Sequence, residues 1–264
     1  MNTKNKLGFK FYRGISGMTI CILFTSACNQ LNRYSICSRE SNQSSGTEKI
    51  KVNSLSIVDS WGNTNFHIEA RYGNLHMIKN LCSDPNVNVN AKNYEGDTPL
   101  HYAACYGHVE VVRALRPHLD IKVNEKDRNG LTPLHYAVAK GHIKVIKELR
   151  KFEGIQINAK DRNGLTPLHA AIYEGHVDIL KKLLKYGGID INQTNRYGET
   201  LLHYTAKKGH LEVVKYLLSH PDIHINKKDN SGKTPLDIAS QSGREKVVGL
   251  LRKYRAISGK ETNK

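Results

Sequence analysis

Residues 127–135 read Asp-Arg-Asn-Gly-Leu-Thr-Pro-Leu-His, and residues 161–169 repeat the same amino acids 34 positions later. The same phase continues in both directions, and one threonine position recurs in six successive units. These threonines are Thr64, Thr98, Thr132, Thr166, Thr200 and Thr234. A fixed period of this length is the signature of a chain built from stacked copies of one structural unit. We therefore expect one elongated domain in which each unit contacts only its neighbours.

Each unit carries the signals of two consecutive helices. Threonine is a good N-cap, and the proline that follows it in most units is favoured at the first helical position. Glycines nine residues after each threonine suit the left-handed conformation that ends a helix. A second apolar stripe then follows at a spacing of three to four residues, for example Ile143, Ile146 and Leu149. The pattern predicts an inner helix, a reversal and an outer helix in every unit.

Taken together, the Gly-x-Thr-Pro-Leu-His start, the alanine-rich run, the Gly-His pair and the apolar outer helix resemble the ankyrin repeat over residues 61–255. The resemblance implies an all-α solenoid of about six helix-turn-helix units joined by hairpin-like fingers. It also implies a non-enzymatic protein–protein interaction module. The period is one residue longer than the 33 typical of the family. We expect the loop before the asparagine that ends each unit to absorb this extra residue.

Nine of the thirteen histidines fall at two repeat positions. They are His67, His101, His135, His169 and His203 at the first, and His108, His142, His176 and His210 at the second. The family resemblance implies that the first set forms hydrogen bonds to the neighbouring unit. No catalytic triad, metal-binding motif or phosphate loop stands out against this background. We expect no enzyme activity, no cofactor and no metal site.

Candidate binding residues lie where the repeat pattern leaves the residue type free. In the fingers these are Tyr94, Lys126, Arg128, Lys160, Arg162 and Arg196, and on the inner helices they are Tyr102, Tyr136 and Tyr204. The period should align the arginines in one column, and we expect the tyrosines to face the same groove. Arginine and tyrosine are enriched at binding hot spots. The pattern indicates an acidic protein partner; the alternative is that recent duplication alone keeps these solvated turns alike.

The formal net charge is +16, of which residues 1–50 contribute +5, so the remainder carries +11. A basic chain can also attract nucleic acid. Its charge is spread over the outer helices too, and no nucleic-acid-binding motif is present, which makes this the weaker alternative. We expect the module to be a monomer.

The first 27 residues resemble a signal peptide, with a basic start, a short apolar run and small residues near Ala27. Cleavage after Ala27 is one reading, and lipidation of Cys28, as in bacterial lipoproteins, is another. A third is an extension without signal function, which would leave the protein in the cytoplasm. Residues 28–60 read as a flexible tether. We expect export or envelope association in a bacterium, with membrane contact only through the leader or a Cys28 lipid. The module would then be a secreted effector of an intracellular bacterium or an envelope-tethered scaffold.

Three further expectations concern individual positions. Cys82 and Cys105 should be packing residues on repeat helices. Arg116 and Arg150 stand where later units have leucine, and their heads should extend to water over buried stems. Polar substitutions around Asp237 indicate a C-terminal cap on the last unit, followed by a polar tail at 256–264.

Overall fold

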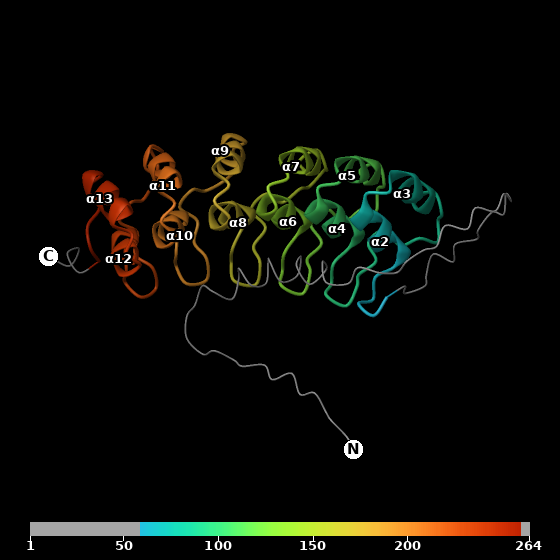
Figure 1. Ribbon diagram of the computed structural model, residues 1–264, viewed down its shortest axis with the longest axis horizontal. Coiled ribbons are helices and arrows are strands. Elements are labelled where there is room, and N and C mark those ends of the chain that lie inside the picture. Colours follow the sequence, from blue (N-terminus) through green and yellow to red (C-terminus); the bar gives the residue numbers. More distant parts are fainter. Residues whose placement is uncertain (1–58, 260–264) are drawn as a thin grey trace, which may run out of the picture. The chain divides into compact units, whose positions relative to one another are not determined.

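A computed structural model describes residues 59–259, which fold into an elongated stack of helix pairs (Figure 1). The inner helices are α2 (Asn65–Tyr72), α4 (Pro99–Tyr106), α6 (Pro133–Ala139), α8 (Pro167–Tyr173), α10 (Leu201–Lys208) and α12 (Pro235–Gln241). The outer helices are α3 (Leu75–Cys82), α5 (Val109–Leu115), α7 (Ile143–Leu149), α9 (Val177–Lys185), α11 (Leu211–Leu218) and α13 (Glu245–Lys253). The expected all-α solenoid is confirmed. The leader, most of the tether and Cys28 lie outside the described residues.

The six repeated threonines are the N-caps of the inner helices, each in a capping box with the residue three positions later. In unit two, the Thr98 backbone N–H donates to Nδ1 of His101 over 3.0 Å. A backbone N–H can only donate, so Nδ1 carries no proton and Nε2 must carry it. His101 Nε2 in turn donates to the carbonyl of Leu131 in the next unit, 3.1 Å away. One neutral histidine thus caps its own helix and binds the following unit.

The same forward contact recurs along the stack. Nε2 atoms contact carbonyl oxygens 30 residues later in the pairs His67–Asp97, His135–Leu165 and His203–Lys233, at 2.9 to 3.2 Å. The second histidine set points the other way. His108, His142 and His176 place Nε2 2.7 to 3.0 Å from carbonyls 37 residues earlier. In the last unit Arg244 Nε donates to the Lys207 carbonyl instead. The predicted structural role of the histidines is confirmed for these residues.

The asparagines that end the units form a further set of contacts between neighbours. Asn124 Nδ2 donates to the Gly154 carbonyl over 2.8 Å, and its Oδ1 accepts the N–H of Gln156 over 2.8 Å. Asn90 and Asn192 make the equivalent pair of bonds to the loops that follow them. The amide therefore satisfies backbone groups of the following unit's loop, which the sequence predicts to carry the extra residue of the period.

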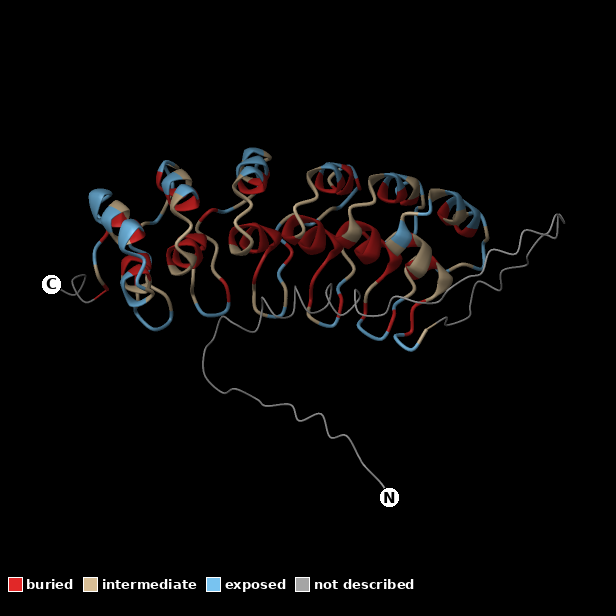
Figure 2. Ribbon diagram, in the orientation of Figure 1, coloured by how far each residue is buried: buried red, intermediate tan, exposed pale blue. Residues whose placement is uncertain are grey.

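Apolar burial lies mainly between the two rows of helices, and the middle inner helices α4, α6, α8 and α10 are buried on nearly every side, whereas the terminal ones, α2 and α12, are partly exposed (Figure 2). On α7 the fully buried residues include Val145 and Leu149, with Ile146 3% exposed. The predicted apolar stripe starts at Ile143, two residues before Val145. Ile143 is only half-buried, because it is the first residue of the helix, directly after the N-cap. Each buried Val, Ile or Leu contributes roughly 1.5–3 kcal/mol.

The expectation that the heads of Arg116 and Arg150 extend to water leaves out their partners: Arg116 is exposed, but each head also contacts a residue of the neighbouring unit. Glu148 on α7 is 5% exposed, and Arg116 lies 3.5 Å from its carboxylate. Lys151 and Arg113 also contact it, at 2.8 and 3.1 Å. Arg150 stacks its guanidinium 3.4 Å above the centre of the Tyr186 ring. Both arginines therefore have partners, because the neighbouring unit supplies a carboxylate or an aromatic face that a single unit does not show.

Unit six is closed by the residues that follow α13. Asp237, where other units have histidine, accepts the N–H of Thr234 over 2.9 Å, Ser258 Oγ–H over 2.7 Å and the Gly259 N–H over 2.8 Å. Burial alone would raise the pKa of Asp237, but these hydrogen bonds outweigh it and lower the pKa to about 2. Residues 256–259, assigned from sequence to a polar tail, thus bond to the last unit.

Cysteines on the repeat helices are shielded from solvent to different degrees. Cys105 on α4 is 7% exposed, but it is disulfide-bonded, so the expectation that it is only a packing residue is not confirmed. Cys82 on α3 is half-buried, and burial raises the pKa of its thiol to about 11. A thiol with a raised pKa holds little thiolate at neutral pH, so Cys82 is a weak nucleophile.

Candidate partner-binding surface

Each finger is the turn that leads to one of the six repeated threonines, and the fingers are numbered in the order of those threonines, so that the third ends at Thr132. The fingers lie at the lower edge of the stack in Figure 1 and are joined to one another by backbone hydrogen bonds. The N–H groups of Arg128, Arg162 and Arg196 donate to carbonyls of the preceding finger over 2.8 to 3.1 Å. Within a finger, Asp127 Oδ1 accepts the N–H groups of Asn129 and Leu131 at 2.8 and 2.7 Å. This arrangement fixes the turn and the spacing between fingers.

A glycine in the turn makes the close approach of fingers possible. Gly130 has φ of 82°, in the left-handed region. A Cβ there would lie 2.8 Å from the backbone nitrogen of Arg162 in the next finger. Glycine therefore supplies both the conformation and the space.

Side chains of the arginine column extend from these fixed backbones into solvent. All three residues are exposed. Arg196 lies over the ring of Tyr197, with 4.7 Å from the guanidinium carbon to the ring centre. Within residues 59–259, the guanidinium groups of Arg128 and Arg162 make no hydrogen bond and no ion pair. Two of the three predicted arginines thus keep their full hydrogen-bonding capacity.

Lysines at one repeat position, Lys92, Lys126 and Lys160, form a second column, the lysine column, whose side chains bond to the next finger instead of extending into solvent. Each lysine donates its ammonium group to the carbonyl of the equivalent residue in the next unit. The three bonds are Lys92 to Lys126 at 3.2 Å, Lys126 to Lys160 at 2.7 Å and Lys160 to Thr194 at 3.2 Å. Lys92 also forms an ion pair with Glu125 at 2.6 Å. The predicted binding residues Lys126 and Lys160 therefore connect fingers while their charge remains exposed.

Tyr102, Tyr136 and Tyr204 do not present their rings to the groove as expected, since they are only 5, 5 and 9% exposed. Each packs edge-on against a histidine of the preceding unit, with ring centres 5.4 to 5.7 Å apart. Their hydroxyls bond to the residues that shape the fingers. Tyr136 donates to Asp127 Oδ2 and Tyr102 to Asn63 Oδ1, both over 2.9 Å. These tyrosines support the surface from below.

Exposed aromatic residues are found in the fingers instead. Tyr94, one of the predicted finger residues, is 52% exposed and stands 34 residues before Arg128. Trp61 and Tyr197 are 41 and 39% exposed, at the position next to that column. Sequence reasoning missed these two, although their shared place three residues before the repeated threonine was a readable signal.

Two acids, the half-buried Asp97 and the buried Asp127, lie at the base of the second and third fingers. Burial raises the pKa of Asp97 to about 7, and the charge of Asp127 adds to the shift. Burial also raises the pKa of Asp127, although hydrogen bonds from Leu131 and Tyr136 oppose it. Units three and four have leucine where Asp97 stands. A neutral Asp97 adds no negative charge beneath the arginine column. Ionisation of Asp97 above neutral pH would weaken the positive electrostatic field of the arginines.

Between residues 59 and 259, no group of three or more His, Cys, Asp and Glu side chains is placed to hold a metal ion. Over the same residues, no helix combines the length and the apolar character needed to cross a membrane.

Interlocked helix pairs with bonded fingers define the chain as a repeat solenoid, a scaffold whose surface positions vary while its core positions are repeated. The family model for ankyrin repeats, in three copies, matches residues 34–127, 119–195 and 188–263, and the chain belongs to this family. No protein among curated sequences matches it. Ankyrin repeats are protein–protein interaction modules and are typically not catalytic.

Proposed function

We propose that the solenoid binds an acidic protein partner through its fingers. The observation that carries this proposal is the arginine column, in which Arg128 and Arg162 expose guanidinium groups that have no partner among the described residues 59–259, on hydrogen-bonded backbones. A guanidinium forms two parallel bonds to a carboxylate. Because the finger backbones are already ordered, binding would cost little conformational entropy there.

Charge and aromatic character support the same reading. The chain carries an excess of 16 positive charges, which speeds encounter with an acidic partner and makes binding sensitive to salt. Trp61, Tyr94 and Tyr197 place exposed rings on the same row of fingers. Aromatic residues next to arginine are typical of binding hot spots. Solvated turns preserved by duplication would account for the repeated arginines, but not for the exposed aromatic residues in the first, second and fifth fingers.

The test exchanges Arg128, Arg162 and Arg196 together for glutamate. The finger backbones, caps and core remain, so the helical content should be unchanged. The matched control exchanges Lys144, Lys182 and Lys246 for glutamate, which alters net charge equally but on the exposed outer helices. Proteins captured from extracts with and without nuclease treatment would be identified by mass spectrometry, and binding of the purified partner would be measured at low and high salt.

We expect the arginine variant to lose an acidic partner that the parent and the lysine control both retain, and the retained binding to weaken with salt. Equal capture by all three proteins would rule out the finger surface. A difference that disappears on nuclease treatment would instead favour nucleic acid as the ligand.

The leader supports the further proposal that the module works outside the bacterial cytoplasm, as a secreted effector or as an envelope lipoprotein. The two are separated by labelled palmitate: incorporation that disappears in Cys28→Ser identifies the lipoprotein. A mature N-terminus at Cys28 without lipid supports secretion. An intact leader in cytoplasmic protein would refute export.

A further inference from the structure

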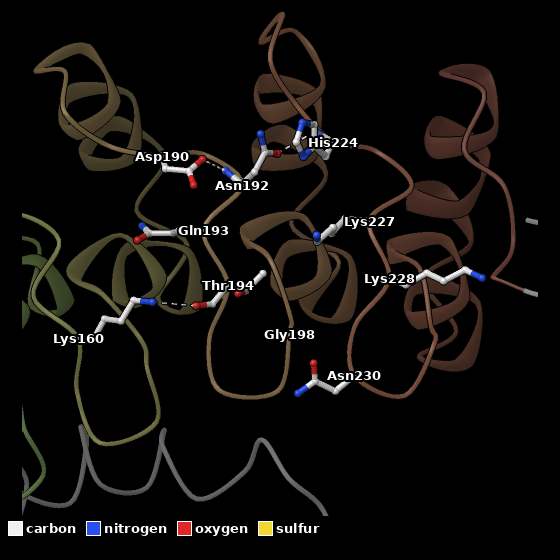
Figure 3. A pocket seen from close by; sticks show the side chains of 10 residues that line it. All are labelled: Lys160, Asp190, Asn192, Gln193, Thr194, Gly198, His224, Lys227, Lys228 and Asn230. Carbon is white, nitrogen blue, oxygen red and sulfur yellow. Dashed lines mark hydrogen bonds between the residues drawn. The ribbon is translucent and has the colours of Figure 1, made fainter.

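A hollow of about 620 Å³ lies beside the fifth and sixth fingers (Figure 3). Its walls come from the arms that lead into the fingers, with Lys160 on one side and Lys227 and Lys228 on the other. Asn192 and Gln193 form part of its lining, as does Thr194. It is open to solvent, so a side chain from a partner could enter without any movement of the stack.

The hollow lies where the lysine column is interrupted. In units two to four, the stem of a lysine extends across to the next finger and its ammonium group bonds to a carbonyl there. Unit five has Thr194 at this position. Its side chain is too short to reach the sixth finger, so the space that a lysine stem covers elsewhere remains open.

Positive charge dominates this space. Three lysines face one carboxylate, that of Asp190, among the lining residues. Lys227 is exposed, and its ammonium group makes no hydrogen bond or ion pair with any residue of the described range 59–259. Lys160 uses one of its three N–H donors on the Thr194 carbonyl. Charged donors are therefore available to an anionic group.

Each neutral amide of the hollow already uses one of its two N–H donors to hold the stack. Asn192 Nδ2 donates to the Asp222 carbonyl, Gln193 Nε2 to Thr166 Oγ1, and Asn230 Nδ2 to the Arg196 carbonyl. Phosphate sites in proteins are usually built from clustered backbone amides or from arginine forks. Here lysine ammonium groups act as separate point charges, and Asp190 opposes a doubly charged guest. A single carboxylate suits this set of groups better than a phosphate.

We propose that the hollow at Thr194 is an anchor for a glutamate or aspartate side chain of the protein partner. This inference rests on the proposed function and adds a defined contact to it. The carboxylate would lie between Lys160 on the fourth finger and the lysines on the sixth, at the point where the stack itself leaves the column unfilled.

The hollow can be tested by filling it. Thr194→Lys restores the column and places a stem across the hollow while adding one positive charge. Ser231→Lys adds the same charge at the exposed tip of the sixth finger, outside the lining. The probe is a fluorescent peptide of four Ser-Glu repeats, with its glutamine counterpart as the uncharged control, measured by anisotropy with the full chain. Acetylation of Lys227, read by mass spectrometry, reports whether the peptide covers the hollow.

If the hollow is the anchor, Thr194→Lys weakens peptide binding by about fivefold or more despite its extra charge, whereas Ser231→Lys maintains or strengthens it. The glutamate peptide, but not the glutamine peptide, should protect Lys227 in the parent. Tighter binding in Thr194→Lys, or no protection of Lys227, would overturn the proposal. A phosphoserine peptide that protects Lys227 better than the glutamate peptide would also overturn it, in favour of a phosphate site.

Failure here is distinguishable from failure of the proposed function. If the arginine variant still loses its partner while Thr194→Lys binds normally, only the anchor is wrong. If an oligothymidylate binds and Thr194→Lys tightens it, the surface is a nucleic-acid site and the carboxylate anchor is refuted.

Discussion

Replacement of His135 by glutamine should alter how the stability of the solenoid depends on pH. His135 is 1% exposed; its Nδ1 accepts the Thr132 N–H over 3.1 Å, and its Nε2 donates to the Leu165 carbonyl over 3.2 Å. Burial lowers the pKa of His135 from 6.5 to about 4, although the bond to Leu165 partly offsets this effect. Glutamine can accept the same N–H in a capping box but does not titrate.

The direction in which stability changes with pH follows from which state of the protein binds the proton. The folded protein holds His135 neutral, whereas the unfolded chain protonates it below about pH 6.5, so unfolding is favoured as the pH falls towards 4. With a folded-state pKa of about 4, protonation of this residue in the unfolded chain should lower the free energy of unfolding by about 2 kcal/mol between about pH 7.5 and pH 5. The raised pKa values of Asp97 and Asp127 act in the opposite direction, but parent and variant share them.

At about pH 7.5 the glutamine variant should be less stable than the parent by about 1–2 kcal/mol, because a packed ring and its bond to the next unit are lost. At about pH 5 the two should be nearly equal, which urea unfolding followed by circular dichroism would measure. Carbon-detected titration of the labelled histidine ring would give the native pKa directly. A constant difference between the two proteins at both pH values, or a native pKa near 6.5, would refute the reasoning.

Two other predictions concern the scaffold. Glu148→Gln should destabilise the stack by about 1–2 kcal/mol, since Lys151, Arg113 and Arg116 lose their shared carboxylate. As a control, Glu110→Gln on the exposed face of α5 should change the free energy of unfolding by no more than about 0.5 kcal/mol. Equal urea midpoints for the two variants would contradict this prediction. Removal of residues 227–264 deletes α12 and α13 and exposes the apolar side of α10, so light scattering should detect self-association, and a monomer with an unchanged melting temperature would disprove the capping role.

Most of the fold could be predicted from the repeat alone. Phase and residue type marked Thr132 as an N-cap, Pro133 as the first helical residue and His135 as a structural residue, and the structure bears out each assignment. These roles depend on short-range geometry and on a neighbour that is always 34 residues away. Regular repetition therefore carries the tertiary contact within the sequence itself.

The candidate site was less predictable. Arg128 and Arg162 are exposed, as a polar turn implies, but Tyr136 was expected on the surface and is buried. A tyrosine is compatible with either place, because its ring is apolar and its hydroxyl polar. The carboxylate of Asp127, which accepts the hydrogen bond from that hydroxyl, shows that the buried place is the right one.

The period and its capping residues were sufficient to establish a stack of helix pairs with aligned fingers, because every unit meets a near copy of itself. The sequence did not determine the role of residues that depart from the repeat. Whether Arg116 is paired, and whether the threonine at position 194 opens a hollow or is simply a shorter side chain, depends on what the adjacent unit places opposite each residue. Those distances exist only after the units are stacked, so the tertiary structure alone decided them.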